Sequence, residues 1–147
     1  SDVYKRQSVY TLFFYGTLMD AVVLKGVTGP NYQELQQQVG ILKDFKRCKV
    51  KGAEYPGIMG SVGDQVEGIV VTGITSQALV LLDDFEDDDY ERKNVIIDLS
   101  NGKKTNALVY VAGPAMLIED EEWKLNEWKL NHRAQFLKKL ESGLKVY

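Results

Sequence analysis

An acidic segment in the middle of the chain holds residue types suited to proton transfer. Six of its seven positions carry carboxylates, in the order Asp83-Asp84-Phe85-Glu86-Asp87-Asp88-Asp89. Three interpretations compete: a solvated surface loop, a divalent-metal site, or a segment whose Glu86 points inward beside Leu82 and Phe85. In the third interpretation, a carboxylate at the wall of a pocket can act as a general acid and base.

The metal interpretation is weak on spacing. A calcium-binding loop that begins at Asp87 would place Asp89, Glu91 and Asp98 at ligand positions. It would also place Arg92 where such a loop requires glycine, and strands rather than helices are expected on both sides. We therefore expect no metal at this segment.

A second segment has the pattern of an anion-binding turn. It reads Phe13-Phe14-Tyr15-Gly16-Thr17-Leu18-Met19. Gly16 ends an apolar run typical of a buried strand, and Thr17 stands where the N-cap of a following helix is expected. The first N–H groups of a helix lack intrahelical partners, so this junction can bind an anion or a developing oxyanion.

The rest of the composition excludes several kinds of chemistry. The chain has one cysteine, Cys48, and one histidine, His132, which argues against a zinc site, a Ser-His-Asp triad and an internal disulfide. We expect a cytoplasmic protein, because cysteine is scarce and no apolar stretch is long enough to span a membrane. A net charge of −3 argues against nucleic-acid binding as a function.

The length and composition predict a single globular domain. The chain has 147 residues, of which 44% are hydrophobic and 27% charged. Residues 1–7 have neither a starting Met nor a signal-peptide core, and we interpret them as a non-native leader before a domain over residues 8–147.

The elements that must position the two segments are mostly strands. We expect extended structure at residues 9–15, 35–51, 65–72, 93–99 and 105–112, with turns at 54–57 and around Gly60 and Gly63. Asn101-Gly102 favours a hairpin between the last two strands. Short helices are expected at residues 20–25 and after Thr75. A C-terminal helix is expected to begin near the carboxylates at 119–122.

A basic run occupies one of the expected strands. It comprises Lys43, Lys46, Arg47, Lys49 and Lys51. A solvated or edge-strand face is the favoured interpretation, and a contact surface for an acidic partner is the alternative.

Taken together, these segments resemble the γ-glutamylcyclotransferase-like superfamily, in its avirulence-induced-gene branch. The resemblance extends over residues 9–140. It rests on these ordered motifs: Tyr15-Gly16-Thr17-Leu18, Tyr55-Pro56, Val66-Glu67-Gly68, Leu82-Asp83-Asp84-Phe85-Glu86, Tyr90-Glu91-Arg92 and Ala107-Leu108-Val109-Tyr110. The Trp123, Trp128, His132 and Phe136 pattern points to the plant-like branch.

The resemblance implies an α+β fold and a reaction. The fold is a mostly antiparallel, six-stranded barrel-like sheet with flanking helices and a long C-terminal helix. The reaction cyclises a γ-glutamyl amide to 5-oxoproline and releases an amine, without a cofactor. Glu86 maps to the acid–base glutamate, and Tyr15, Gly16, Thr17 and Leu18 map to the turn that binds the glutamyl group. At Asp87, many relatives have glycine.

Two questions stay open at the level of sequence. One is whether the domain is an enzyme for a small γ-glutamyl substrate or a catalytically silent module that binds a glutamyl-like ligand or a protein. The other is the identity of the leaving amine, together with the oligomeric state. For the enzyme, like charge from Asp83, Asp84, Asp87, Asp88 and Asp89 is expected to raise the pKa of Glu86.

Overall fold

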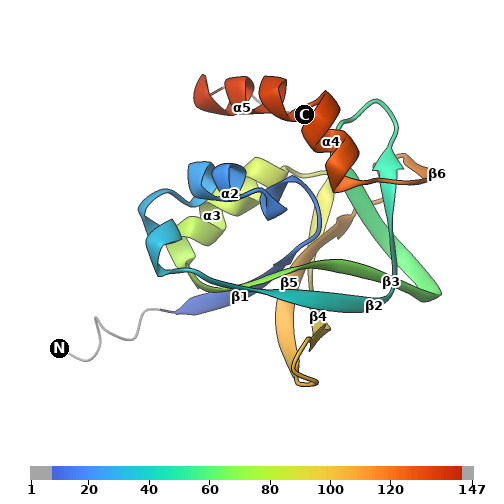
Figure 1. Ribbon diagram of the computed structural model, residues 1–147, viewed down its shortest axis with the longest axis horizontal. Coiled ribbons are helices and arrows are strands. Elements are labelled where there is room, and N and C mark those ends of the chain that lie inside the picture. Colours follow the sequence, from blue (N-terminus) through green and yellow to red (C-terminus); the bar gives the residue numbers. More distant parts are fainter. Residues whose placement is uncertain (1–7, 144–147) are drawn as a thin grey trace.

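The computed structural model describes residues 8–143, so the leader predicted at residues 1–7 lies outside the described residues (Figure 1). The described chain contains six strands and several short helices. The strands are β1 (Val9–Phe14), β2 (Gln36–Val50), β3 (Pro56–Thr75), β4 (Tyr90–Leu99), β5 (Lys104–Ala112) and β6 (Ile118–Glu122). The helices are η1 (Thr17–Met19), α2 (Ala21–Thr28), η2 (Gly29–Glu34), α3 (Ser76–Glu86), α4 (Leu125–Asn131) and α5 (Arg133–Glu141).

The strands form one barrel-like sheet in the order β3-β1-β5-β4-β2-β6. An additional pairing between β3 and β2 closes five of them into a ring, and β6 attaches to β2 beside it. All described pairings are antiparallel except that of β1 with β5, which meet at Leu12 and Leu108. The predicted α+β class and six-stranded, mostly antiparallel sheet are confirmed.

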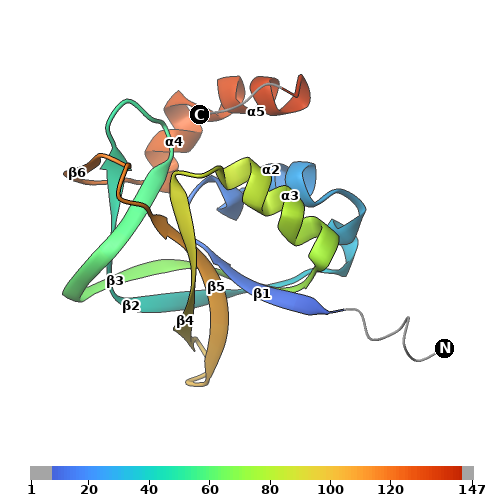
Figure 2. The ribbon, with the colours of Figure 1, turned by 180° about the vertical axis from the view of Figure 1, so that it is seen from behind.

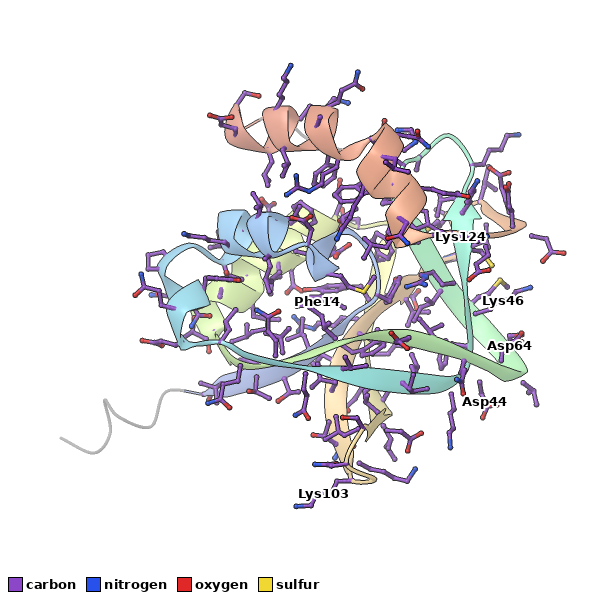
Figure 3. The ribbon with its side chains drawn as sticks, viewed as in Figure 1. Phe14, Asp44, Lys46, Asp64, Lys103 and Lys124 are labelled. Atoms are coloured by element: carbon purple, nitrogen blue, oxygen red, sulfur yellow. The ribbon has the colours of Figure 1, made fainter. Side chains whose placement is uncertain are left out.

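Strand β1 separates two apolar cores, because successive side chains of a strand point to opposite faces. Phe13 and Tyr15 belong to a cluster inside the ring of strands. Leu12 and Phe14 belong to a second cluster beneath the helices, and Figure 3 shows Phe14 between the sheet and the helical layer. Seen from behind, α2 and α3 lie side by side over the sheet, with α5 beyond them (Figure 2).

The turn predicted around Gly60 and Gly63 is wrong, because β3 continues through both positions. The irregularity is a bulge in β3, where residues 61–64 lie opposite the single residue Asp44 of β2. The register shifts between Lys43 and Phe45, where Asp44 takes a left-handed conformation (φ 65°) and its side chain accepts a hydrogen bond from the Gly63 N–H at 3.0 Å. Such a bulge bends a long hairpin without interrupting it.

The predicted C-terminal helix is also corrected in part. The carboxylates at 119–122 lie in β6, and the helical residues are divided at His132 into α4 and α5. Lys46 and Lys49 of β2 pair with Asp120 at 3.4 Å and with Glu121 at 2.9 Å. Pairing across the strands therefore replaces the helix-dipole interaction that the sequence pattern suggested. Within the described residues, no helix is long and apolar enough to cross a membrane.

Candidate functional site

The two segments singled out in the sequence meet at one small pocket. The turn of Tyr15, Gly16, Thr17 and Leu18 lines one side, and Glu86, at the end of α3, lines another. Tyr55, Pro56, Tyr90 and Tyr110 complete the wall together with Phe13 and Phe14. The cavity volume is about 30 Å³, so the pocket is small.

The turn is built differently from the N-cap pattern predicted at Thr17. Thr17 is the first residue of η1 and is buried, and the residue before it, Gly16, makes no side-chain cap. The N-cap is Asp20, whose carboxylate accepts hydrogen bonds from the N–H groups of Val22 at 3.0 Å and Val23 at 3.3 Å. A short 3-10 turn thus stands between the strand and α2, and the capping residue comes after it.

Glycine is required at position 16 by space. Its φ of −124° suits any residue, but an added Cβ would lie 2.9 Å from Cγ of Pro56. Pro56 begins β3 and lines the same pocket. The close approach therefore brings two walls of the pocket together.

Asp20 also joins this turn to the end of the chain. Arg133 of α5 donates from Nε to the Asp20 carboxylate at 2.6 Å. Burial would raise the pKa of Asp20, but the hydrogen bonds and charge of Arg133, with the two backbone N–H groups, lower it below its ordinary value. Sequence reasoning missed this pair, because the two residues are far apart in the chain.

Glu86 is half-buried at the C-terminal end of α3. Burial, followed by the nearby charge of Asp83, raises its pKa from 4.5 to about 8. The next residue, Asp87, has φ 66°, in the left-handed region that favours glycine. Helix α3 therefore ends in a backbone conformation that a residue with a side chain rarely adopts.

The predicted direction of the Glu86 pKa shift agrees with the structure, but the predicted cause does not. Desolvation dominates, and Asp83 is the one carboxylate that contributes clearly. Asp83 lies one helical turn before Glu86 and is itself held by Arg92 at 2.6 Å and by the Tyr110 hydroxyl at 2.7 Å. Asp87 and Asp88 instead line a neighbouring depression with Asp83 and Arg92.

Three tyrosine hydroxyls link the walls of the pocket. Tyr15 donates to the carbonyl of Tyr110, and Tyr90 donates to the carbonyl of Pro56 at 2.5 Å. Burial is the largest cause that raises the pKa values of Tyr15, Tyr90 and Tyr110, so these hydroxyls stay protonated as hydrogen-bond donors. Sequence reasoning quoted Tyr90 and Tyr110 only as parts of motifs. The available signal for Tyr90 was its place at the start of β4, directly after the acidic segment, whereas Tyr110 lies within β5 and had no such signal.

The acidic residues do not assemble into a recognisable metal site. Across residues 8–143, no group of three or more His, Cys, Asp or Glu side chains is arranged to hold a metal ion. Asp98, a ligand in the calcium register, pairs instead with Lys43 at 3.5 Å and with Lys104. What the pocket offers is one carboxyl group of raised pKa, phenolic donors and the backbone of a tight turn.

Comparisons with known proteins agree with this architecture. The profile of the family described as "Gamma-glutamyl cyclotransferase, AIG2-like" matches residues 12–129. AIG2-like protein D of Arabidopsis thaliana is 35% identical over 137 residues, which cover 89% of this chain and 86% of that protein. AIG2-like protein A of the same plant is 31% identical, over 88% of this chain and 78% of its own length.

Solved structures give the same result for the fold. A solution structure from Arabidopsis thaliana superposes with a TM-score of 0.67 at 30% identity and covers 93% of this chain and 91% of its own. A structure named gamma-glutamyl cyclotransferase superposes with a TM-score of 0.63 at 18% identity, over 92% and 88% of the two chains, and supports the fold alone. With its matching profile, its relatives and its ring of strands, this chain belongs to the γ-glutamyl cyclotransferase, AIG2-like family.

Proposed function

We propose that this protein is a γ-glutamylcyclotransferase that converts a γ-glutamyl amide into 5-oxoproline and a free amine. The observation that carries the proposal is the meeting of Glu86 with the Tyr15–Leu18 segment at one pocket. Family membership supports the same reaction class. The substrate provides its own nucleophile, so the chemistry requires no Ser, Cys or His from the protein.

In the proposed reaction, the Glu86 carboxylate takes a proton from the α-ammonium group of the substrate. The freed α-amine attacks the γ-carbonyl carbon, and a C–N bond forms to close a five-membered ring. The amide C–N bond then breaks as Glu86 returns its proton to the departing nitrogen, and the second proton of the ring nitrogen passes through the same carboxylate to the released amine, which leaves as an ammonium ion. Atoms and charge balance without an oxidant or a second substrate.

The environment of Glu86 suits both steps. A carboxyl group with a pKa of about 8 is a stronger base than an ordinary glutamate and can still donate to an amine that leaves. Burial is the main cause of that shift, and burial also strengthens electrostatic contacts within the pocket. The protonated hydroxyls of Tyr15, Tyr90 and Tyr110 keep the wall around the carboxyl group neutral.

The Tyr15–Leu18 segment is proposed to bind the glutamyl end of the substrate through backbone groups. Peptide N–H groups at the start of a helical turn are suited to a carboxylate or to the developing oxyanion.

The test is release of 5-oxoproline from a panel of γ-glutamyl amines, γ-glutamyl dipeptides, glutathione and ε-lysine isopeptides. Wild-type protein should release it from at least one member. Glu86→Gln should retain the fold and lose about 10²–10⁴-fold in rate. Glu91→Gln, which removes an exposed carboxylate on β4, is the matched control and should behave as wild type.

Two outcomes would contradict the proposal. Turnover by Glu86→Gln at the wild-type rate would remove Glu86 from the mechanism. Binding of a γ-glutamyl compound, measured by calorimetry, without release of 5-oxoproline from any member of the panel would support a catalytically silent binding module instead.

A further inference from the structure

Arg47 differs from the other cations of the basic run. Lys46 and Lys49 extend toward carboxylates of β6, and Figure 3 shows Lys46 at the outer edge of the sheet. The guanidinium of Arg47 instead contacts backbone carbonyls. Its Nη1 donates to the carbonyl of Tyr15 at 2.9 Å and to that of Glu67 at 3.3 Å. One basic residue of β2 thus reaches the first residue of the predicted substrate-binding turn.

The guanidinium is held in a defined place. It lies over the Trp123 ring, 5.6 Å from the ring centroid, and Trp123 is itself buried. Burial, the largest cause, lowers the pKa of Arg47 from its ordinary value, and the charges of Glu122 and Glu67 oppose this change. Its Nε is buried and has no hydrogen-bond partner among the described residues, and such a donor costs free energy. An apolar side chain in this position would not carry that cost.

The hydrogen bond from Arg47 to the Tyr15 carbonyl acts on the Tyr15–Gly16 peptide, which belongs to the candidate site. A peptide is planar, so its carbonyl and its N–H point in opposite directions. Holding the Tyr15 carbonyl toward Arg47 therefore fixes the direction of the Gly16 N–H. Gly16 lines the pocket and directly precedes η1. The orientation of this peptide decides how the whole turn is presented to a ligand.

We propose that Arg47 is a positioning residue of the candidate site, whose guanidinium fixes the Tyr15–Gly16 peptide in the orientation that binds the glutamyl end of the substrate. The kinetic part of this inference rests on the proposed function. Lysine is a poor substitute, because it lacks the planar group that bridges two carbonyls while stacking on an indole.

The experiment compares wild type with Arg47→Met, Arg47→Lys and Lys46→Met. Lys46→Met is the matched control, because it removes the same charge from the adjacent position of β2, where the side chain pairs with exposed Asp120. Two measurements are made on each protein. One is the NMR shift of the Tyr15 carbonyl carbon and the Gly16 amide. The other is KM and kcat for the γ-glutamyl compound that wild type converts.

In Arg47→Met, we expect both NMR signals to move and KM to rise on the order of tenfold, since a hydrogen bond from a charged donor is lost. We expect kcat to change less than KM, because the turn holds the glutamyl group in both ground and transition states. Arg47→Lys should have a KM between those of wild type and Arg47→Met. Lys46→Met should match wild type in both measurements.

Unchanged NMR signals in Arg47→Met would overturn the inference, and so would moved signals with an unchanged KM. If Arg47→Met does not fold, Arg47→Lys carries the test, and its equality with wild type in either measurement is the contradicting result. If wild type releases no 5-oxoproline, the proposed function fails separately. The NMR comparison then still decides whether Arg47 holds the peptide.

Discussion

At the scale of single residues, the proton affinity of Glu86 is the property most open to measurement. Its pKa of about 8 means that the carboxylate fraction grows as pH rises through 8. If the carboxylate starts the reaction, the acidic limb of the rate–pH profile lies near pH 8. Asp83→Asn removes the one clear charge contribution, so the limb should move to lower pH. The move should be smaller than the whole shift, because burial is the larger cause.

The double variant Asp87→Asn with Asp88→Asn is the control for that measurement. These carboxylates lie beside the site but contribute no resolved shift to Glu86, so the limb should stay in place. A limb that moves in the double variant and stays in Asp83→Asn would restore the explanation suggested by charge density alone. Raising the salt concentration should reduce any shift caused by exposed charge.

At the scale of elements, the turn after β1 depends on close packing against the start of β3. Gly16→Ala introduces a Cβ within 2.9 Å of the Pro56 ring, which has little freedom to move aside. Overpacking of this kind typically costs about 1–3 kcal/mol in the free energy of unfolding. We expect a lower melting temperature and, at a temperature where the variant is folded, weaker binding of the γ-glutamyl substrate by calorimetry. Gly16→Val should show both effects more strongly.

Gly60→Ala is the matched control for this change. Gly60 lies in β3, the strand that Pro56 begins, but a Cβ added at Gly60 would meet no atom within 4 Å. It should therefore bind substrate as wild type does. Wild-type binding by folded Gly16→Ala would show that the approach of Gly16 to Pro56 is unnecessary for the site.

At the scale of the whole molecule, the C-terminal helices stabilise the site turn from a distance. Arg133→Met leaves the buried Asp20 carboxylate without its cation. Removing one partner leaves an uncompensated charge, and we expect a loss in the free energy of unfolding that is smaller than for a fully buried pair, because Arg133 is one-third exposed. Chemical denaturation should show this loss near pH 7. Lys129→Met, on the exposed side of α4, is the control.

The stability lost in Arg133→Met should decrease as the pH falls. Asp20 has a lowered pKa in the folded chain, so its pairing stabilises the fold above the unfolded pKa of about 3.9. That contribution disappears as pH falls through the lower, folded pKa. The stability difference between wild type and Arg133→Met should therefore shrink in acid. If the stability difference instead stays constant down to low pH, lost packing alone explains the effect of Arg133→Met.

The sequence by itself determined the fold class and the two segments of the candidate site. Alternating apolar residues and the Asn101-Gly102 turn are local signals, and they predicted strands that the structure contains. The family resemblance joined Tyr15–Leu18 to Glu86. Each of these inferences rests on neighbours in sequence or on a known pattern.

The tertiary structure alone decided which distant groups meet. Acidic residues before α4 form a strand that pairs with β2, and two of them make ion pairs with Lys46 and Lys49, although their position suggested a helix start. Arg133 reaches Asp20 across more than a hundred residues, and Arg47 reaches Tyr15 from a strand that looked merely solvated. Burial explains the proton affinity of Glu86, and burial depends on packing that no local pattern encodes.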